Sequence, residues 1–398
     1  MPVTVGIDVA KEFHWAAAID TVTAEVLLSR RVDNDPASLQ ALIDELSLLQ
    51  PEPSSVRVGV DVVGGIASLL TAMLADGGFQ LLHVPGLAVN RARQGTTGGE
   101  HKSDPRDARV IADQVRTRTD LRPLERSSEL EAEIRLLVGR RRELVTDQTR
   151  RLGRLHDLLA SIHPGLERLV DPTQKTGLWL LTRYVTPAEI RRAGSKRLIA
   201  HLKRAGHLRQ AQIERLAERA LTAAGTQTLA VPGERVAADL VRELASEALA
   251  ARQRLARLDT QLEEALERHP DAALIRSLPG MGATLTAEFI AEAGGISRFP
   301  TPDRLAAAAG LAPILKQSGK VRYLHRPSGG NKTLKRVFYQ SAFCSLSHSA
   351  SRTFYARKRA EGKRHHQALI ALARRRVDVL HAILRTREPY RLDYAKAT

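Results

Sequence analysis

The first 84 residues alternate short runs of β-branched and apolar residues with stretches of helical periodicity. Three such runs come first, followed by a helix that Asn34 and Asp35 open and that ends before Pro51. A fourth run ends in Gly64-Gly65, and a second helix and a last short run follow. The expected elements are the strands Val3–Val9, Phe13–Ile19, Glu25–Val32, Val56–Val62 and Gln80–Val84 and the first helix, Pro36–Leu49. This order, βββαβαβ, predicts a mixed sheet flanked by helices.

Two long stretches in the middle of the chain carry leucines at three- and four-residue steps, with arginine and glutamate between them. They are about Ser127–His163 and Leu240–Leu266. The pattern predicts two long amphipathic helices, which could form an antiparallel hairpin within one chain or a coiled coil between chains. Residues 165–232 predict shorter helices. Their breaks are Pro172, Pro187 and Pro232, and their basic stretch is Lys196–Arg209.

A third part begins near Asp271, where Leu278-Pro279-Gly280-Met281-Gly282 separates two helical patterns. A turn of this kind is similar to the hairpin of helix-hairpin-helix modules, in which backbone N–H groups at a helix start contact a phosphate. Proline-glycine turns also connect helices without any ligand, so both interpretations stay open. Further on, Gly329-Gly330-Asn331 predicts a loop before a basic helix.

Charge is distributed very unevenly along the chain. The 398 residues have a formal net charge of +17, yet residues 1–100 hold 6 Lys or Arg against 12 Asp or Glu, which leaves +23 for the remainder. A basic surface of this size attracts phosphate backbones, so we expect nucleic acid as the partner. The competing interpretation is an arginine-rich composition with solvated helix faces. Aromatic residues make up only 4%, so phosphate contacts rather than base stacking should dominate the affinity.

Several classes of protein are disfavoured by what the sequence lacks. No run of about 18 apolar residues occurs and the N-terminus lacks the pattern of a signal peptide, so we expect a cytoplasmic protein that contacts no membrane. The single cysteine, Cys344, excludes an internal disulfide and a cysteine-rich zinc site, and we expect it to lie in the core.

Acidic residues interrupt two of the apolar runs. Asp8 and Asp61 stand where an unpaired carboxylate would be costly to bury. The order βββαβαβ is that of the ribonuclease-H-like fold, although other α/β folds share it, and in such a sheet strands one and four are neighbours. Two carboxylates close together raise each other's pKa and are readily neutralised by Mg²⁺.

A third acidic motif is Lys102-Ser103-Asp104-Pro105-Arg106-Asp107-Ala108, which leads into a helical pattern. We expect Asp104 as the N-cap, Pro105 at the first helical position and Asp107 on the same side. Taken alone, the motif fits a purely structural helix start equally well. Together with the two strand acids it favours a Mg²⁺ site made by Asp8, Asp61, Asp104 and Asp107, as two-metal phosphoryl transfer requires.

Motifs at both ends of the chain resemble the insertion-sequence 110 transposases, also called DEDD transposases, a family that includes site-specific invertases. The N-terminal motifs are Gly6-Ile7-Asp8-Val9-Ala10-Lys11 and the block from Lys102 to Ala108. The C-terminal motifs are Leu278–Gly282, Phe299, Ala309-Gly310-Leu311-Ala312-Pro313, Gln317-Ser318-Gly319-Lys320 and Gly330-Asn331-Lys332-Thr333-Leu334-Lys335-Arg336. One difference is visible, because Asp61 stands where the family pattern usually has Glu and is one methylene shorter.

The resemblance implies a DNA transposase or site-specific recombinase of α/β plus α class. Its parts would be a ribonuclease-H-like, resolvase-like catalytic domain (1–122), a helical coiled-coil region with a helical insert (123–270) and a mostly helical C-terminal transposase domain (271–398). Ser318 matches the family's nucleophilic serine. Members of the family resemble recombinases guided by a structured bridge RNA that pairs with donor and target DNA. We therefore expect donor DNA, target DNA, a guide RNA and Mg²⁺ as partners, and a homodimer that assembles to a tetramer.

Basic residues near Ser318 are expected to contact the nucleic acid. Lys320 and Arg322 are candidates to stabilise charge on a reacting phosphate. The other expected contacts are Asn331, Lys332, Lys335 and Arg336. Ser328 is the nearest competing nucleophile, and Tyr323 lacks the matching motif.

Two other classes of function remain as alternatives. Actin-like sugar kinases and chaperone ATPases also open with Gly-x-Asp on a first strand, but the arginine-rich helical remainder offers neither a second phosphate-binding hairpin nor an adenosine-binding loop. The other alternative is a nucleic-acid-binding protein without catalytic activity, to which the aspartate at position 61 lends some support.

Overall fold

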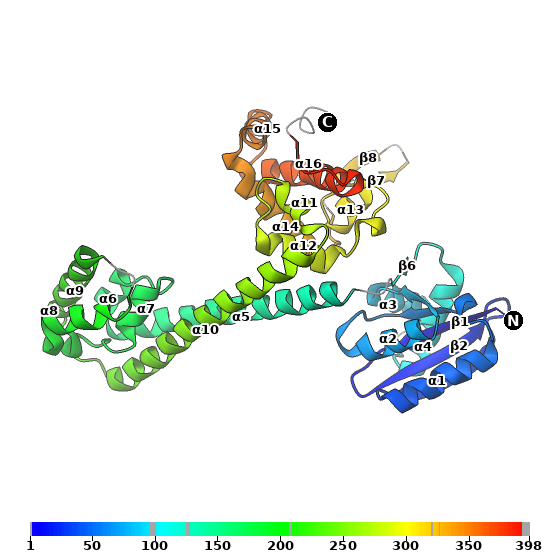
Figure 1. The fold of residues 1–398 in the computed structure, drawn as a ribbon, viewed down its shortest axis with the longest axis horizontal. Coiled ribbons are helices and arrows are strands. Elements are labelled where there is room, and N and C mark those ends of the chain that lie inside the picture. The colour runs from blue at the N-terminus through cyan, green and yellow to red at the C-terminus, as the bar shows by residue number, and fades with distance from the viewer. Residues whose placement is uncertain are drawn as a thin grey trace. The chain divides into compact units, whose positions relative to one another are not determined.

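The computed structural model describes residues 2–95, 101–124, 128–206, 209–319, 321–325 and 327–391. The chain forms two compact units, Met1–Ser128 and Glu129–Thr398 (Figure 1). The first unit contains a mixed sheet with helices, and the second, as far as its residues are described, is helical apart from one hairpin of two strands. Among the described residues, no helix is long and apolar enough to cross a membrane.

Within the described residues, the sheet of the first unit has six strands in the order β3-β2-β1-β4-β5-β6. The strands are β1 (Val3–Asp8), β2 (Phe13–Asp20), β3 (Val26–Asp33), β4 (Arg57–Val60), β5 (Gln80–His83) and β6 (Arg122–Pro123). The strand β1 runs antiparallel to β2 and parallel to β4. The predicted element order is therefore confirmed, and so is the prediction that the first and fourth strands are neighbours.

Helices cover both faces of this sheet. They are α1 (Pro36–Leu49), α2 (Ser68–Asp76), α3 (Gly86–Gln94) and α4 (Asp104–Thr117), with the short 3₁₀ turns η1 (Pro53–Ser55) and η2 (Gly65–Ala67). The bounds of α1 are those that the sequence predicts. The side chain of Asp35 caps α1 by accepting the backbone N–H groups of Ala37 and Ser38, each at 3.0 Å.

The two faces of β1 have different neighbours because side chains alternate along a strand. Val5 and Ile7 are fully buried in the core that α1 and α2 complete. On the other face the backbone of α4 lies directly over Gly6, where an added Cβ would stand 2.2 Å from the carbonyl oxygen of Ala108. Asp8 shares the face of Gly6, so α4 covers the side of the strand on which Asp8 points.

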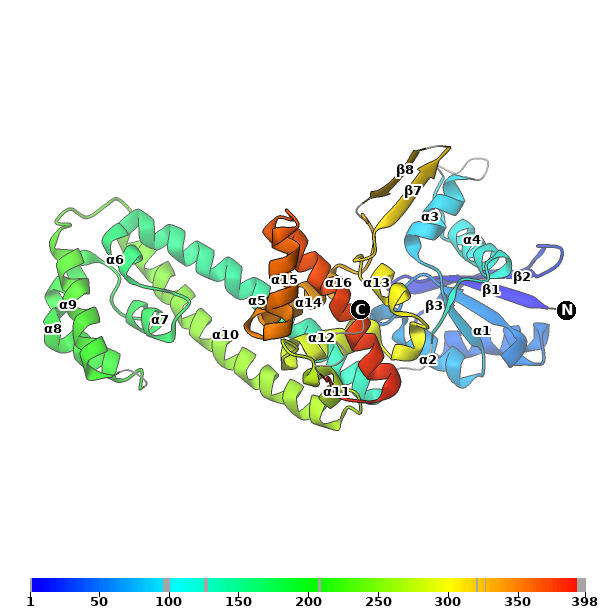
Figure 2. The same ribbon diagram turned by 90° about the horizontal axis from the view of Figure 1, so that it is seen from above.

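The second unit is built on two long helices, α5 (Glu129–Ile162) and α10 (Glu234–Arg268), which lie side by side (Figures 1 and 2). Ion pairs join Glu133 to Arg268 at 2.7 Å and Arg151 to Glu247 at 2.8 Å, so the helices run antiparallel. Of the two arrangements that the leucine pattern allows, the structure contains the hairpin within one chain. The helices α6 (Pro164–Leu169), α7 (Lys175–Leu181), α8 (Pro187–Lys203) and α9 (Gln210–Gly225) pack at one end of this hairpin with a core of their own.

The C-terminal part of this unit packs at the other end of the hairpin, around a core that includes Phe289 and Phe338 in edge-to-face contact. Its elements are α11 (Ala272–Ser277), α12 (Ala283–Ala293), η3 (Ile296–Arg298), α13 (Pro302–Ala308), β7 (Ile314–Ser318), β8 (Val321–His325), α14 (Lys332–Cys344), η4 (Ser345–Ser347), α15 (Ser349–Ala360) and α16 (His365–Thr386). The predicted turn at Leu278–Gly282 does connect two helices, α11 and α12. The hairpin of β7 and β8 was not predicted.

The expectation of a buried Cys344 is wrong, because this thiol is exposed. The buried stripe of α14 contains Leu334, Val337, Phe338 and Ser341 at three- and four-residue steps. Residue 344 falls beside that stripe, next to the exposed Phe343.

Candidate active site

Asp8 and Asp61 meet at one edge of the sheet. Asp8 ends β1 and Asp61 directly follows β4, and the parallel pairing of Ile7 with Val60 places the two acids at the same level. The Oδ1 atom of Asp61 accepts the backbone N–H of Val9 at 3.2 Å. Both acids are half-buried. The carboxyl ends of these parallel strands therefore carry two neighbouring carboxylates, as the strand pattern predicts.

The first turn of α4 adds two more acids, Asp104 and Asp107. The prediction that Asp104 is the N-cap is wrong, because Ser103 takes that position and its carbonyl oxygen accepts the N–H of Asp107 at 2.9 Å. Asp104 is the first residue of the helix and Pro105 the second. Asp107 is only 5% exposed and directly precedes Ala108, whose backbone lies over Gly6 of β1. The close packing of α4 on β1 thus places Asp107 near Asp8.

The negative charges of these acids repel one another. Burial, followed by repulsion from Asp61, Asp107 and Asp104, raises the pKa of Asp8 to about 7, against a smaller lowering effect of Lys102. Burial also raises the pKa of Asp61, although the N–H of Val9 favours its charged form. A positive charge at this edge of the sheet would therefore be favourable, and it would compete with protons for the carboxylates.

A residue that the sequence pattern does not reveal, Arg93, neutralises one of the four acids. Its Nη1 atom lies 2.7 Å from both carboxylate oxygens of Asp107, and its Nη2 atom donates to the side chain of Asn90 at 2.8 Å. This pair joins α3 to α4. In the part of the chain that the structure describes, no three Asp, Glu, His or Cys side chains are gathered closely enough to hold a metal ion as they stand.

Ser318 lies in the second unit, at the end of β7, and its side chain is exposed. Val321 is its partner across the hairpin, whereas Arg322 pairs with Gln317 and so lies on the opposite face. The competing nucleophile Ser328 is exposed in the segment that leads to α14. Lys320 lies outside the described residues.

Two of the residues expected to contact nucleic acid have partners within the fold. Asn331 is the N-cap of α14: its Oδ1 accepts the N–H groups of Thr333 and Leu334, and its Nδ2 donates to Glu292 at 2.8 Å. Arg336 forms an ion pair of 2.5 Å with the buried Glu288. By contrast, Lys332 is exposed and Lys335 is half-buried beside a cavity.

The turn between α11 and α12 is fixed by a buried arginine. Arg376 of α16, which is 4% exposed, donates from Nη2 to the carbonyl oxygen of Pro279 and from Nε to the hydroxyl of Ser341 at 2.9 Å. Gly280 has a positive φ of 82°, and a Cβ there would lie 2.5 Å from the carbonyl oxygen of Ser341. The turn is thus held against α14 and α16, and its role toward a phosphate stays a prediction.

Two family models match this chain at its two ends. Residues 5–164 match a DEDD transposase domain of IS110 type, and residues 272–356 match the family of IS116, IS110 and IS902 transposases. The chain belongs to this transposase family. The first match contains all four acids at the edge of the sheet, and the second contains Ser318. The protein is accordingly a DNA transposase of an insertion element.

Two relatives of this transposase are similar over nearly the whole chain, and a third is similar over a smaller part. A protein of the insertion element IS116 from Streptomyces clavuligerus is 43% identical over 96% of this chain and 94% of its own length. The putative transposase of IS117 from Streptomyces coelicolor is 30% identical over 97% of this chain and 94% of its own length. A pilin gene-inverting protein of Moraxella bovis is 27% identical over 34% of this chain and 45% of its own. Among solved structures, T. thermophilus RuvC in complex with a Holliday junction substrate matches 31% of this chain and 100% of its own, with 16% identity and a TM-score of 0.25.

Proposed function

We propose that this transposase cuts and rejoins DNA strands with Ser318 as the nucleophile and with Asp8, Asp61, Asp104 and Asp107 as a Mg²⁺ site. The observation that carries the proposal is the convergence of Asp8, Asp61 and the first turn of α4 at one edge of the sheet. Four acids at one place with a raised pKa for Asp8 are unfavourable for stability alone. Such an arrangement is typical of a site that binds a cation or handles protons.

The chemistry of these side chains fits magnesium. All four offer carboxylate oxygens, which hard divalent cations prefer, and a cation there would relieve the repulsion around Asp8. When bound, the metal would supply positive charge at the reacting phosphate. Asp61 holds the backbone N–H of Val9 with one oxygen, so its position is fixed before any ion binds. Asp107 begins paired with Arg93, and its oxygens become ligands only if that pair opens.

The serine would act as follows. In the proposed step a bond forms between Oγ of Ser318 and a DNA phosphorus while the bond from that phosphorus to one deoxyribose oxygen breaks, and the serine's proton ends on the leaving oxygen. The hydroxyl of a new strand end reverses the step and releases the serine. Because the phosphodiester energy is kept in the covalent link, the strands are rejoined without ATP. The exposure of Ser318 on a hairpin supports access of DNA to its hydroxyl.

Phosphate contacts are assigned to basic side chains of the second unit. Lys332 and Lys335 at the start of α14, together with Lys320 and Arg322, are proposed to contact DNA or a guide RNA. Asn331 and Arg336, whose side chains are engaged with Glu292 and Glu288, are proposed to act by holding α14 in place. Guidance by a structured RNA, and a homodimer that assembles to a tetramer, belong to the same proposal.

A denaturing gel of the transposase mixed with labelled element-end DNA and Mg²⁺ tests the nucleophile. The wild type should give a slowly migrating protein–DNA adduct, and Ser318→Ala should give none. An adduct that persists in Ser318→Ala and vanishes in Ser328→Ala or Tyr323→Phe would contradict the assignment. A wild type that binds DNA but never cleaves it would favour the alternative of a nucleic-acid-binding protein without catalysis.

The acids are tested in the same assay. Asp8→Asn and Asp104→Asn should abolish the adduct and leave DNA binding nearly intact. Asp113→Asn is the matched control, because Asp113 lies on the same helix α4 but pairs with Arg116 at 2.7 Å and is not one of the four proposed ligands. Full activity of both Asp8→Asn and Asp104→Asn would overturn the metal site.

A further inference from the structure

The hairpin of β7 and β8 has two chemically different faces. Its strands pair Ser318 with Val321, Lys316 with Tyr323 and Ile314 with His325. Because residues two apart share a face, the side chains of these three pairs lie on one side of the hairpin. The intervening pairs, Gln317 with Arg322 and Leu315 with Leu324, lie on the other side. The face of Ser318 therefore carries Lys316, Tyr323 and His325, and Arg322 is directed away from it.

The residues of this face are exposed to solvent in their own unit. Figure 2 shows the hairpin extending away from helices α13 to α16, and every residue of both strands is exposed, including Tyr323 at 51% and Val321 at 61%. Among the described residues, the side chains of Lys316, Ser318 and Tyr323 take part in no hydrogen bond or ion pair. A two-stranded hairpin alone is only marginally stable in water, so it gains from a ligand that covers it.

The surrounding charge favours a polyanion as that ligand. Residues 304–360, which include the hairpin and α14, contain 12 Lys or Arg and neither Asp nor Glu. A protein partner would have to place acidic side chains along this whole stretch, whereas a nucleic-acid strand carries one phosphate per nucleotide as a matter of course. An aromatic ring beside a lysine on one open face also fits a strand whose bases can stack.

We propose that the Ser318 face of this hairpin holds the DNA strand that is cut, with Lys316 on a non-bridging oxygen of the attacked phosphate and Tyr323 stacked on a neighbouring base. The inference rests on the proposed role of Ser318 and adds the residues that position the substrate. Lys316 and Ser318 are two residues apart, or about 6.6 Å along the strand, a gap that the flexible lysine side chain spans easily. Lys316 thus takes the role that spacing in the sequence suggested for Arg322.

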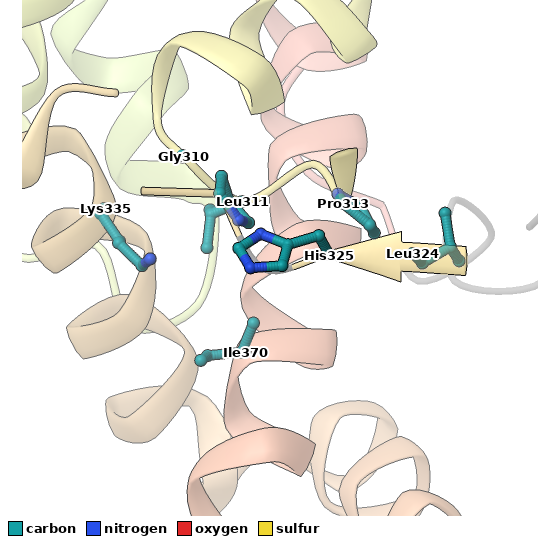
Figure 3. A pocket seen from close by; sticks show the side chains of 8 residues that line it. Gly310, Leu311, Pro313, Leu324, His325, Lys335 and Ile370 are labelled. Atoms are coloured by element: carbon teal, nitrogen blue, oxygen red, sulfur yellow. The ribbon is translucent and has the colours of Figure 1, made fainter. Parts of the chain in front are cut away.

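The proposed path of the DNA strand continues at the base of the hairpin. A cavity of about 210 Å³ lies there, lined by residues that include Leu311, His325, Lys335 and Ile370. Figure 3 shows the imidazole of His325 and the amino group of Lys335 turned into this cavity from opposite sides. Since His325 is on the face of Ser318, Lys335 is placed to receive the next phosphate of a strand that follows this face.

The test compares the two faces by single-turnover adduct formation at saturating DNA and over a range of DNA concentrations. Lys316→Gln should lower the saturated rate by about a hundredfold, because one charged contact to the reacting phosphate is lost, and Lys316→Arg should restore most of it. Arg322→Gln removes the same charge from the opposite face of the same hairpin. It should raise the DNA concentration needed for half-maximal rate and leave the saturated rate within about threefold.

Substitutions of Tyr323 give an independent test of the proposed stacking on a base. Tyr323→Ala should weaken DNA binding by about tenfold through lost stacking, whereas Tyr323→Phe, which keeps the ring, should not. All these side chains are exposed, so the variants should melt at the temperature of the wild type. Equal effects of Lys316→Gln and Arg322→Gln on the saturated rate would overturn the inference, and so would an unchanged rate in Lys316→Gln. An adduct in Ser318→Ala would instead refute the nucleophile, so the two failures are distinguishable.

Discussion

The Nη1 atom of Arg93 lies 2.7 Å from both carboxylate oxygens of Asp107, and both side chains are largely buried. The pair joins α3 to the helix that covers Asp8. Arg93 thereby supplies, in the protein without metal, a positive charge where four acids converge. The arginine and a bound cation would compete for the same carboxylate.

Replacement of Arg93 by glutamine should destabilise the metal-free protein by about 3 kcal/mol, because it leaves the buried carboxylate of Asp107 without its partner. The double variant Arg93→Gln, Asp107→Asn should recover much of the loss, since no unpaired charge remains. Urea unfolding of the four proteins of this double-mutant cycle measures the coupling. Additive effects of the two single substitutions would show that the ion pair contributes nothing to the free energy of unfolding.

Asp8→Asn should stabilise the metal-free protein while it abolishes strand cleavage. The pKa of Asp8 is raised to about 7 from an ordinary 3.8, mainly by burial and then by the neighbouring acids. Between these two pH values the folded state holds a proton that the unfolded state has lost, so stability falls as pH rises, and the full penalty is present above pH 7. The amide of asparagine carries no charge and avoids this penalty.

Thermal melts without Mg²⁺ test whether the charge of Asp8 lowers stability as the pH rises. Asp8→Asn should melt above the wild type at pH 8 and close to it at pH 4. Asp113→Asn, whose aspartate is paired with Arg116 on the same helix, serves as the control. A variant that melts below the wild type by the same amount at both pH values would mean that Asp8 is a structural residue.

Much of the first unit follows from the sequence because its central strands, β1 and β4, are buried on both faces and therefore consist of nearly continuous apolar runs. Short runs of apolar and β-branched residues define the strands, and Asp35 followed by Pro36 defines the start of α1. The β7–β8 hairpin was missed for the opposite reason. All its residues are exposed, so Ile314, Leu315 and Val321 show no alternation between buried and exposed positions that a pattern could reveal.

The acids of the site were predictable, but their partners were not. Asp8 and Asp61 are conspicuous as charges within apolar runs, and the parallel strands bring them together. The contact of Arg93 with Asp107 depends on how α3 lies against α4, which local sequence does not encode. The N-cap of α4 was assigned one residue too late, because both Ser103 and Asp104 are residue types that favour that position.

Acid should destabilise the helices at the tip of the α5–α10 hairpin through two buried histidines. His163 lies 2.9 Å from the carbonyl oxygen of Val185, and His201 lies 2.8 Å from that of Trp179, whose indole N–H donates back to His201 at 2.9 Å. Burial lowers the pKa of both imidazoles below 6.5.

For a base with a lowered pKa, the unfolded state binds the proton first, so stability should fall as pH drops below about 6.5. NMR titration of the histidine ring signals, assigned with His163→Gln and His201→Gln, gives the two midpoints directly. Both should lie below 6.5, and the wild type should melt lower at pH 5 than at pH 7. Midpoints above that value would contradict the burial of the neutral rings.

The contact between α4 and β1 is the feature on which the geometry of the acids depends most. An added Cβ at Gly6 would stand 2.2 Å from both the carbonyl oxygen of Ala108 and the backbone nitrogen of Ala112, and backbone atoms inside a helix cannot move aside singly. Gly6→Ala should therefore push α4 away from β1 and destabilise the protein by about 3 kcal/mol. Since α4 carries Asp104 and Asp107, the same shift should separate them from Asp8.

Gly139→Ala is the matched control for this substitution. Gly139 lies within α5, and nothing stands within 4 Å of the Cβ that alanine would add. Alanine favours a helix interior over glycine by about 0.5–1 kcal/mol, so this variant should melt slightly above the wild type and keep full strand cleavage. Gly6→Ala should melt well below it and lose cleavage even at temperatures where circular dichroism shows it folded. If the folded Gly6→Ala protein cleaved DNA at the normal rate, the acids of α4 would not need their present distance from Asp8.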